Sequence, residues 1–447
     1  MKRKDDFLKT VCTLAVPVAL QSMLQSSFSM VDQIMIGQLG EISVAGVGLA
    51  GKFGSIYSVV ISAIGAAAGI MISQYLGQKN EGAVRRSFAV NLLLGAGIAG
   101  IFTVLCVLFP SQIMGAYTKD AQTRRAAAEY LALISGTFLP MAGATLLSTL
   151  LRCREKPRLP LYASIAAALL NTGLNDILIF GKLGLAPMGI KGAAIATVAS
   201  QCTNFLIMLW MLPRNRTVPR RETFAAQFQW RQYLSMLLPL LVCEVAWSLG
   251  ENVYAAIYGH MGTDASAAMV LTNPVQGLVI GALCGLSQAA SVLIGKRLGS
   301  GENEEAFQES KKLLLYGAVG SLALSVIVVL FSGVYADIYR VDPSVKTMTR
   351  QLLLAYALVA PFKVLNMILG GGILRSGGRT KYVMFIDMAG TWCFGVPLGL
   401  LSAFLWKLPA AWVYFLLSLE ECIRFGISLA VFCGKKWIRR LPDTVDA

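Results

Sequence analysis

Carboxylate and amide side chains interrupt several long apolar stretches of the chain, and the first set lies near the N-terminus. Gln21, Gln25, Ser29 and Asp32 follow one another at steps of three or four residues, which places them along one face of a helix. An ionisable side chain within a membrane span costs about 3 kcal/mol to insert, so it usually faces a polar interior. A carboxylate with amide and hydroxyl oxygens around it suits a proton or a sodium ion. An interfacial position for Asp32, five residues before Gly37, is the alternative.

Polar residues in two later apolar stretches complete a candidate cation site. The stretch near residue 170 and the one near residue 200 supply the amide, carboxylate and hydroxyl groups that we expect to join Asp32: Asn171, Asn175, Asp176 and Thr197. Each has a structural alternative. The two asparagines could hold helices together by interhelical hydrogen bonds, and Thr197 could bond a carbonyl of its own helix. Asp176 lies about 100° round the helix from Asn175, so it could face a different neighbour.

The second half of the chain has a different polar pattern. Glu244 and Glu251 are seven residues apart, and so within about 20° of each other on one helix face. Acids interleaved with aromatic rings suit an organic cation, which gains Coulomb attraction and cation–π contact. We expect a substrate cavity lined by Gln25, Glu244, Trp247, Glu251 and Tyr254. The alternative is that each glutamate pairs with a buried base such as Lys363 or Arg424.

The elements that carry these residues are predicted to be membrane-spanning helices. The chain has 447 residues, of which 56% are hydrophobic and 14% charged, against roughly 25% charged in a soluble domain. Lipid offers no hydrogen-bond partner to the backbone, so each apolar run of about 20 residues is expected to cross as a helix. We predict an all-α membrane protein with twelve transmembrane helices, centred near residues 24, 60, 98, 138, 170, 200, 246, 280, 321, 360, 393 and 421.

The twelve predicted helices form two copies of one six-helix unit. Pro17 and Gly37 recur as Pro239 and Gly259, 222 residues later, and Arg152 recurs 223 residues later as Arg375. An even number of spans leaves both copies with the same orientation. The repeats are therefore parallel, and a substrate is expected between them near the middle of the membrane, in a central cavity.

The repeated prolines predict bends. Pro17 and Pro239 each remove one backbone hydrogen bond from the first helix of a repeat. A bend at Pro17 would move the part of the helix that carries Asp32, so we expect both prolines to act as hinges. A static kink is the alternative.

The distribution of basic residues predicts the topology. With the N-terminus inside, 27 Lys and Arg residues fall on the cytoplasmic side and 9 on the other. This asymmetry follows the positive-inside rule and places both termini in the cytoplasm of a multi-pass protein of the cell membrane. It accounts for the net charge of +15 by topology and contact with anionic lipid rather than by nucleic-acid binding. We expect an N-lobe at 1–212, a polar cytoplasmic linker at 213–232 and a C-lobe at 233–447.

Several functional classes lack their sequence signals. No GxxxxGK[ST] motif is present, which argues against direct use of ATP. The single histidine, His260, and nine cysteines without metal-ligand spacing argue against a metal site. No catalytic motif is found, so we expect a protein that is not an enzyme and needs no cofactor.

Four segments carry a family resemblance across nearly the whole chain: MVDQIMIGQLG (30–40), ISQYLGQKN (72–80), LNDILIFGKLGLAPMGIKGAAIAT (174–197) and GGILRSGGRTKY (371–382). The chain resembles the multidrug and toxic compound extrusion (MATE) transporters of bacteria. The resemblance implies two lobes around a V-shaped central cavity and rocker-switch alternating access. It also implies export of cationic or amphiphilic drugs in exchange for inward H⁺ or Na⁺.

Individual positions of the resemblance bear on the coupling ion. Asp32 matches the family's acid in the amino-terminal cation site, Pro17 matches its bend, and Asn171 matches an asparagine of the fifth helix. Asn175 stands where many members carry Asp. With one carboxylate fewer, we expect H⁺ coupling, with Na⁺ as the alternative.

A second function would use the same fold. Flippases for lipid-linked oligosaccharides belong to the same superfamily, and their cavities tend to be cationic because they hold phosphate. The charges within helices 1, 5 and 7 of this chain are acidic, which favours small organic cations as the cargo. We expect a monomer whose other contacts are with membrane lipid.

Overall fold

The computed structural model describes the backbone of residues 2–212, 228–339 and 341–442, with side chains from Phe7 onward. Within these ranges the chain is helical and contains no β-strand. Part of the expected linker, residues 213–227, lies outside the described residues, together with four of its arginines.

Each of the twelve predicted centres falls within one long helical stretch. The first repeat consists of α1 (Lys2–Gly37), α2 (Glu41–Gly77), α3 (Glu81–Leu108), α5 (Ala121–Ile134) with α6 (Phe138–Cys153), α7 (Arg158–Phe180) and α8 (Ile190–Trp210). A short helix, α4 (Pro110–Gly115), precedes α5.

The second repeat follows the same order: α11 (Trp230–Met261), α12 (Thr263–Ser300), α13 (Asn303–Ile338), α14 (Pro343–Asn366), then α15 (Thr380–Met388) with α16 (Val396–Leu400), and α17 (Ala410–Cys433). In its fourth and fifth spans, π-helical turns interrupt or extend the α-helices, at Met367–Leu374, Ala389–Gly395 and Leu401–Leu405.

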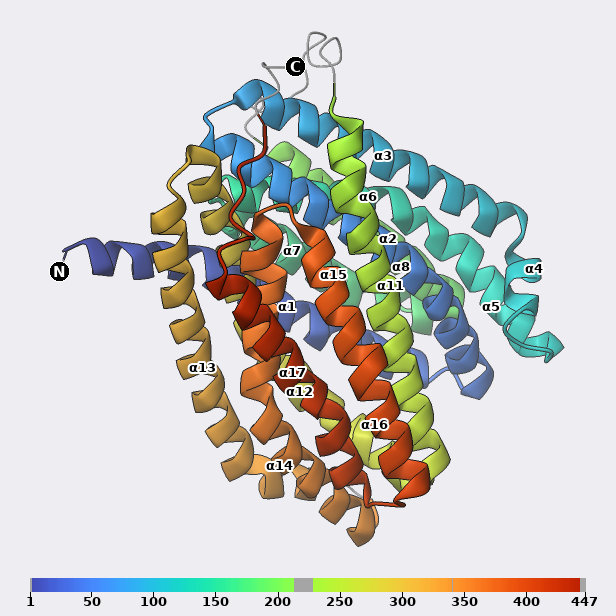
Figure 1. Ribbon diagram of the computed structural model, residues 1–447. Coiled ribbons are helices and arrows are strands. Elements are labelled where there is room, and N and C mark those ends of the chain that lie inside the picture. Colours follow the sequence, from blue (N-terminus) through green and yellow to red (C-terminus); the bar gives the residue numbers. More distant parts are fainter. Residues whose placement is uncertain (1, 213–227, 340, 443–447) are drawn as a thin grey trace. The chain divides into compact units, whose positions relative to one another are not determined.

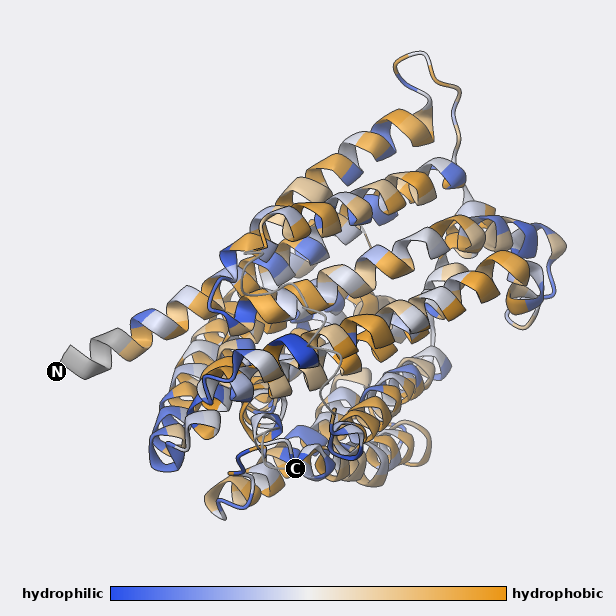
Figure 2. Ribbon diagram, turned by 90° about the horizontal axis from the view of Figure 1, so that it is seen from above, coloured by the Kyte–Doolittle hydropathy of each residue, from blue (hydrophilic) through white to orange (hydrophobic). Residues whose placement is uncertain are grey.

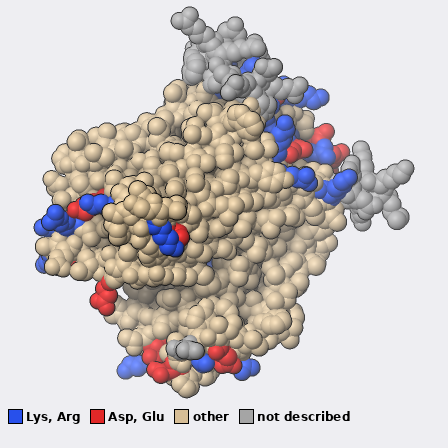
Figure 3. Space-filling view, turned by 180° about the vertical axis from the view of Figure 1, so that it is seen from behind, with Lys and Arg blue, Asp and Glu red and all other residues tan. Residues whose placement is uncertain are grey.

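The helices have the length and apolar character of membrane spans, which confirms the fold class. Among the described residues, eleven helical stretches are long and apolar enough to cross a membrane. The twelfth, α17, has 24 residues but carries Glu420, Glu421 and Arg424 in its middle. Figure 2 shows hydrophobic residues along most of each long helix. On the face seen in Figure 3, uncharged residues cover most of the surface, and the charged side chains appear in a few separate groups.

The described helices pack into two compact units. Unit 1 contains Met1–Ala19, Ser73–Lys79 and Gln229–Ala447, and unit 2 contains Leu20–Ile72 and Asn80–Phe228. In unit 1, α13, α14 and α17 lie side by side, and in unit 2, α3 packs against α6 and α7 against α8 (Figure 1). The start of α1 and the last turns of α2 therefore pack with the second half of the chain.

The last turns of α2 and α12 meet in unit 1 in a contact that follows the repeat. A Cβ on Gly77 would overlap the backbone carbonyl of Lys296, and a Cβ on Gly299 would overlap that of Gln74. Residues 74 and 77 correspond to residues 296 and 299 at an offset of 222. The contact of Gly77 with Lys296 and the contact of Gly299 with Gln74 are therefore equivalent in the repeat. Only glycine allows two backbones to approach this closely. The contact confirms the sequence repeat in three dimensions.

Side chains in the connections set where some helices begin. Asn80 Oδ1 accepts a hydrogen bond of 2.9 Å from the N–H of Ala83 at the start of α3. Asp120 accepts one of 2.8 Å from the N–H of Thr123 at the start of α5. These bonds satisfy N–H groups that the first turn of a helix leaves without partners. The hydrogen bond from Thr123 also holds the pKa of Asp120 below its usual value.

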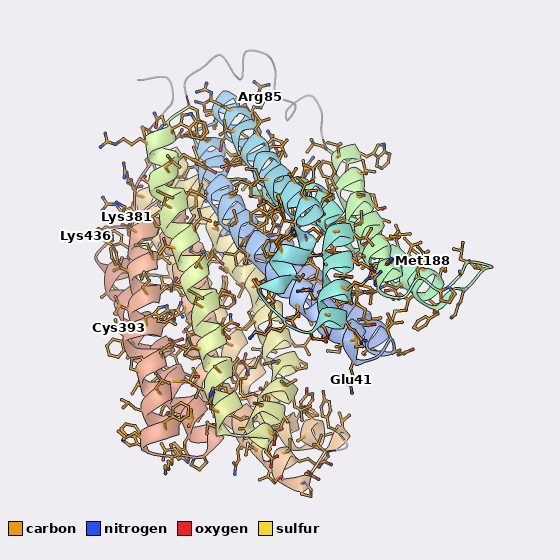
Figure 4. All side chains as sticks on the ribbon, turned by 90° about the vertical axis from the view of Figure 1, so that its right-hand side faces the viewer. Glu41, Arg85, Met188, Lys381, Cys393 and Lys436 are labelled. Atoms are coloured by element: carbon orange, nitrogen blue, oxygen red, sulfur yellow. The ribbon has the colours of Figure 1, made fainter. Side chains whose placement is uncertain are left out.

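The two repeated prolines lie where the sequence predicted them. Pro17 is inside α1 and Pro239 is inside α11. In unit 2, Figure 4 shows Arg85 near one end of the helices and Glu41 at the opposite end.

Candidate functional site

A chain of hydrogen bonds joins three helices of unit 2 around Asp32. Asn175 Nδ2 donates to Asp32 Oδ1 at 2.6 Å and to Asn171 Oδ1 at 3.2 Å. Asn171 Nδ2 donates to Thr197 Oγ1 at 3.4 Å, and Thr197 Oγ1 donates to the carbonyl of Ala193 at 2.9 Å. The structure thus brings together four of the predicted cation-site residues, from α1, α7 and α8.

The bonds leave two oxygens of this cluster available. Both protons of the Asn175 amide are used, by Asp32 and Asn171, so the orientation of that amide is determined by its acceptors. Its Oδ1 is buried and has no partner among the described residues. Asp32 Oδ1 already accepts a bond, and the described part of the chain places no donor on Oδ2, which can therefore take a proton without disturbing Asn175. A proton, or a cation bound between these oxygens, would satisfy groups that are otherwise unpaired.

Asp176 lies apart from this cluster. Both of its carboxylate oxygens accept bonds from Lys182 Nζ, at 2.7 and 2.8 Å. Its side chain is 44% exposed, whereas Asn175 is fully buried. The quarter turn that separates consecutive residues of a helix sends the amide inward and the acid to the surface of unit 2. Gln25, also predicted to line a site, is exposed on α1.

An arginine of α6 reaches the first helix of unit 2. Arg152 Nη2 donates to Gln21 Oε1 at 3.0 Å, and Gln21 Nε2 donates to Ser164 Oγ at 2.8 Å. Gln21 is buried, so this trio ties α1 to α6 and α7 one turn after Pro17.

The same trio recurs in unit 1 with different side chains. Arg375 Nη2 donates to Cys243 Sγ at 3.4 Å, and Cys243 Sγ donates to Asp387 Oδ2 at 2.8 Å. Residues 21, 152 and 164 correspond to 243, 375 and 387 at offsets of 222, 223 and 223. Where unit 2 uses neutral partners, unit 1 uses an acid. Asp387 also pairs with Arg424 of α17, and Arg375 lies 3.5 Å from Glu244.

Glu251 and Tyr254, by contrast, line a partly open polar cavity of about 80 Å³ within unit 1. Tyr254 Oη donates to Glu420 Oε2 at 2.7 Å, and Lys363 and Glu421 line the same cavity. The structure therefore brings Glu251 and Tyr254 together and leaves Glu244 with Arg375. Trp247, on the same helix, is 49% exposed.

This cavity is the repeat-related counterpart of the Asp32 cluster. Asp32 corresponds to Tyr254 at an offset of 222, and Thr197 corresponds to Glu420 at an offset of 223. The carboxylate has changed places, from the first helix of the repeat in unit 2 to the sixth helix in unit 1. The two units thus hold a carboxylate in corresponding clusters, but at different positions of the repeat.

Comparison with known proteins decides the family. The MatE family model matches residues 17–177 and again residues 239–401, so it begins at the two repeated prolines. The chain belongs to the MatE family. The resemblance predicted from its sequence is confirmed, and the chain is a membrane transporter rather than an enzyme.

The relatives of this MatE chain match over nearly their whole length. It is 24% identical to a probable multidrug resistance protein NorM of Thermotoga maritima, over 97% of this chain and 93% of that one. It is 25% identical to the multidrug resistance protein MdtK of Yersinia pseudotuberculosis, over 97% and 96%. Among solved structures, a mutant of the Vibrio cholerae MATE transporter VcmN superposes with a TM-score of 0.89 at 16% identity, covering 98% of this chain and all of that one.

Sequence reasoning missed the inward-facing arginines of this MatE chain. The positive-inside count takes Arg152 and Arg375 as charges of the cytoplasmic side, whereas both side chains turn into their units. The signal that could have identified them was present, because both are marks of the repeat. In both copies the recurring arginine bonds to the same position of the first helix of the repeat, which is Gln21 in unit 2 and Cys243 in unit 1.

Proposed function

We propose that this transporter exports cationic or amphiphilic organic compounds in exchange for protons that move inward. The repeats, expected as an N-lobe at 1–212 and a C-lobe at 233–447 joined at 213–232, would alternate access by a rocker-switch motion about Pro17 and Pro239. Both termini would lie in the cytoplasm, as the distribution of basic residues predicts.

One observation carries the proposal, namely the Asp32 cluster. Its carboxylate lies in a membrane-spanning helix, accepts a single hydrogen bond of 2.6 Å from Asn175, and keeps one oxygen free. Ionisable residues within spans are costly and mark ion pathways. Oδ1 of Asn175, an acceptor, is buried and has no hydrogen-bond partner among the described residues, so the cluster can accept a further proton or cation.

The composition of the cluster supports H⁺ over Na⁺. A sodium ion prefers several hard oxygens with more than one negative charge among them. Asp176, the second acid in the predicted set, pairs with Lys182 instead. The other residues of the hydrogen-bonded cluster contribute amides and a hydroxyl, and a proton needs only the one carboxylate.

Unit 1 supports a cationic cargo. Glu251 is exposed at the edge of the polar cavity and shares the exposed side of α11 with Trp247. An organic cation would gain charge attraction and ring contact there. Glu244 is already neutralised by Arg375 at 3.5 Å, so it adds less attraction than the sequence alone suggested.

A matched pair of variants tests the coupling site. We expect Asp32→Asn to reduce efflux driven by a pH gradient to the level of protein-free liposomes, while Asp176→Asn, the same chemical change one residue from Asn175, transports like the wild type. The measurement is efflux of a cationic dye from proteoliposomes, with gel filtration of both variants to check folding. Efflux by Asp32→Asn near the wild-type rate, or loss of efflux in Asp176→Asn alone, would contradict the assignment of Asp32.

Collapsing each gradient separately identifies the ion. Efflux should stop when the pH gradient is removed and continue when the Na⁺ gradient is removed. The opposite result would assign the coupling to Na⁺.

A further inference from the structure

A hollow of about 530 Å³ lies in unit 1 where α11 begins. One wall is formed by the first residues of α11, and the facing wall by the chain segment that follows α17, which we call the strap (Gly434–Pro442). Lining residues include Trp230, Arg231 and Gln232 on α11, and Arg439 and Leu441 on the strap. The hollow shares no lining residue with the polar cavity and none with the Asp32 cluster.

The strap is held firmly in place. Trp437 is fully buried, and its ring stacks on Phe432 with centroids 5.7 Å apart. Gln74 of α2 donates to the carbonyl of Arg439 at 3.2 Å and accepts from the N–H of Leu441 at 2.8 Å. The backbone on both sides of the Arg439 side chain is therefore fixed, so the wall of the hollow is preformed.

The hollow is lined by positive charge without acid. Arg231 and Arg439 are both exposed, and no carboxylate among the described residues lines the hollow or pairs with either. Nearby bases are neutralised, since Arg297 pairs with Glu309 at 2.9 Å and Lys435 pairs with Glu304 at 2.8 Å. Two guanidinium groups that face one space without a counter-ion attract an anion.

Neutral donors add to these charges. The N–H groups in the first turn of α11 have no intrahelical acceptor, and Gln229 makes no side-chain cap bond to them. Both polar atoms of the Gln232 side chain are shielded from solvent and have no hydrogen-bond partner among the described residues. Amides in such positions normally have partners, and an anion bound in the hollow would supply an acceptor for this amide nitrogen.

We propose that this hollow binds the phosphate headgroup of an anionic phospholipid such as phosphatidylglycerol or cardiolipin. One guanidinium group can donate two parallel hydrogen bonds to the oxygens of a phosphate, and the first turn of the helix supplies further donors from its backbone. A lipid is the source because the hollow opens at the end of a membrane-spanning helix, beside Trp230, which is 51% exposed as tryptophans at a membrane interface are. The apolar side chains of Met236 and Leu441 also line the hollow and can contact the glycerol and upper acyl chain.

Native mass spectrometry of the full-length protein tests this site, with titration of phosphatidylglycerol or phosphatidylcholine into detergent micelles. We expect selective retention of phosphatidylglycerol. The double change Arg231→Gln, Arg439→Gln should lower the affinity for phosphatidylglycerol about 30-fold, since each arginine near an anionic surface contributes a factor of about five. Gln232→Leu keeps every charge and should lower the affinity for phosphatidylglycerol several-fold. This variant tests the site even if the double variant folds poorly.

A control separates a site from diffuse charge. Lys381 and Lys436 lie at the same end of unit 1 (Figure 4) but do not line the hollow, so Lys381→Gln, Lys436→Gln should leave the affinity unchanged. Equal losses in both double variants would overturn the proposal in favour of general surface charge. Retention of phosphatidylcholine to the same extent would show that no anion site exists. Displacement of the lipid by millimolar inorganic phosphate would assign the hollow to a free anion.

Discussion

Replacing Asn175 by aspartate places a second carboxylate directly against Asp32. The Asn175 amide nitrogen is 2.6 Å from Asp32 Oδ1, so the centres of the two carboxylates would lie about 4 Å apart. At that distance two unit charges repel by about 4 kcal/mol at an effective dielectric constant of 20 and by about 1 kcal/mol in bulk water. Asp32 is partly exposed, so we expect a value between these limits.

This repulsion is relieved when the pair takes up one cation. Because about 1.4 kcal/mol corresponds to a factor of ten, the variant should bind a proton between about fivefold and a thousandfold more tightly. The pH at which transport is half-maximal should rise by about 0.7 to 3 units. A pair of carboxylates also forms a better sodium site, so transport should become sensitive to Na⁺.

Initial rates of dye efflux from proteoliposomes, measured across about four pH units with and without Na⁺, would report both effects. Asn171→Asp provides a graded control, because its carboxylate would lie one hydrogen bond farther from Asp32 and should shift the midpoint less. An unchanged midpoint in Asn175→Asp, or a larger shift in Asn171→Asp, would refute the assignment of the transport-linked cation to Asp32.

Two further predictions concern stability. Gly299→Ala should lower the free energy of unfolding by about 1–3 kcal/mol or more, because the added Cβ meets the backbone of Gln74, which cannot move aside as a flexible side chain would. Gly97→Ala is the control, because open space surrounds this helical position, and it should be neutral or stabilising. Thermal unfolding in detergent compares the two variants, and equal midpoints would contradict the close contact. The hydrogen bond from Arg297 lowers the pKa of Glu302, so the ionised acid stabilises the folded protein at pH values above its unfolded pKa, and this contribution is lost as the pH falls through the folded pKa. The thermal midpoint of Glu302→Gln should therefore lie below that of the wild type near pH 7 and approach it in acid. A difference that stays constant with pH would refute the pairing.

The sequence by itself determined the twelve helices, their division into two parallel repeats and the core of the cation site. Lipid forces each apolar run into a helix, so length and composition suffice to find the spans. Asn171 and Asn175 are four residues apart, so helical geometry alone places them on one face. Their contact with Asp32 also requires α7 to lie beside α1. The family resemblance implied this arrangement, and the hydrogen bond of 2.6 Å from Asn175 to Asp32 shows it.

The tertiary structure decided which partner each charged group takes. The sequence allowed Asp176 to join Asp32, but its position on the helix leads it to pair with Lys182. It likewise allowed Glu244 to join Glu251, but Glu244 pairs with Arg375. Periodicity defines the face on which a residue lies, yet it does not define which neighbouring helix covers that face. Long side chains such as arginine add to this freedom, because they can extend toward solvent or turn into the protein at little cost in covalent geometry. The choice depends on the charges that other helices bring within reach, and those contacts exist only in the packed fold.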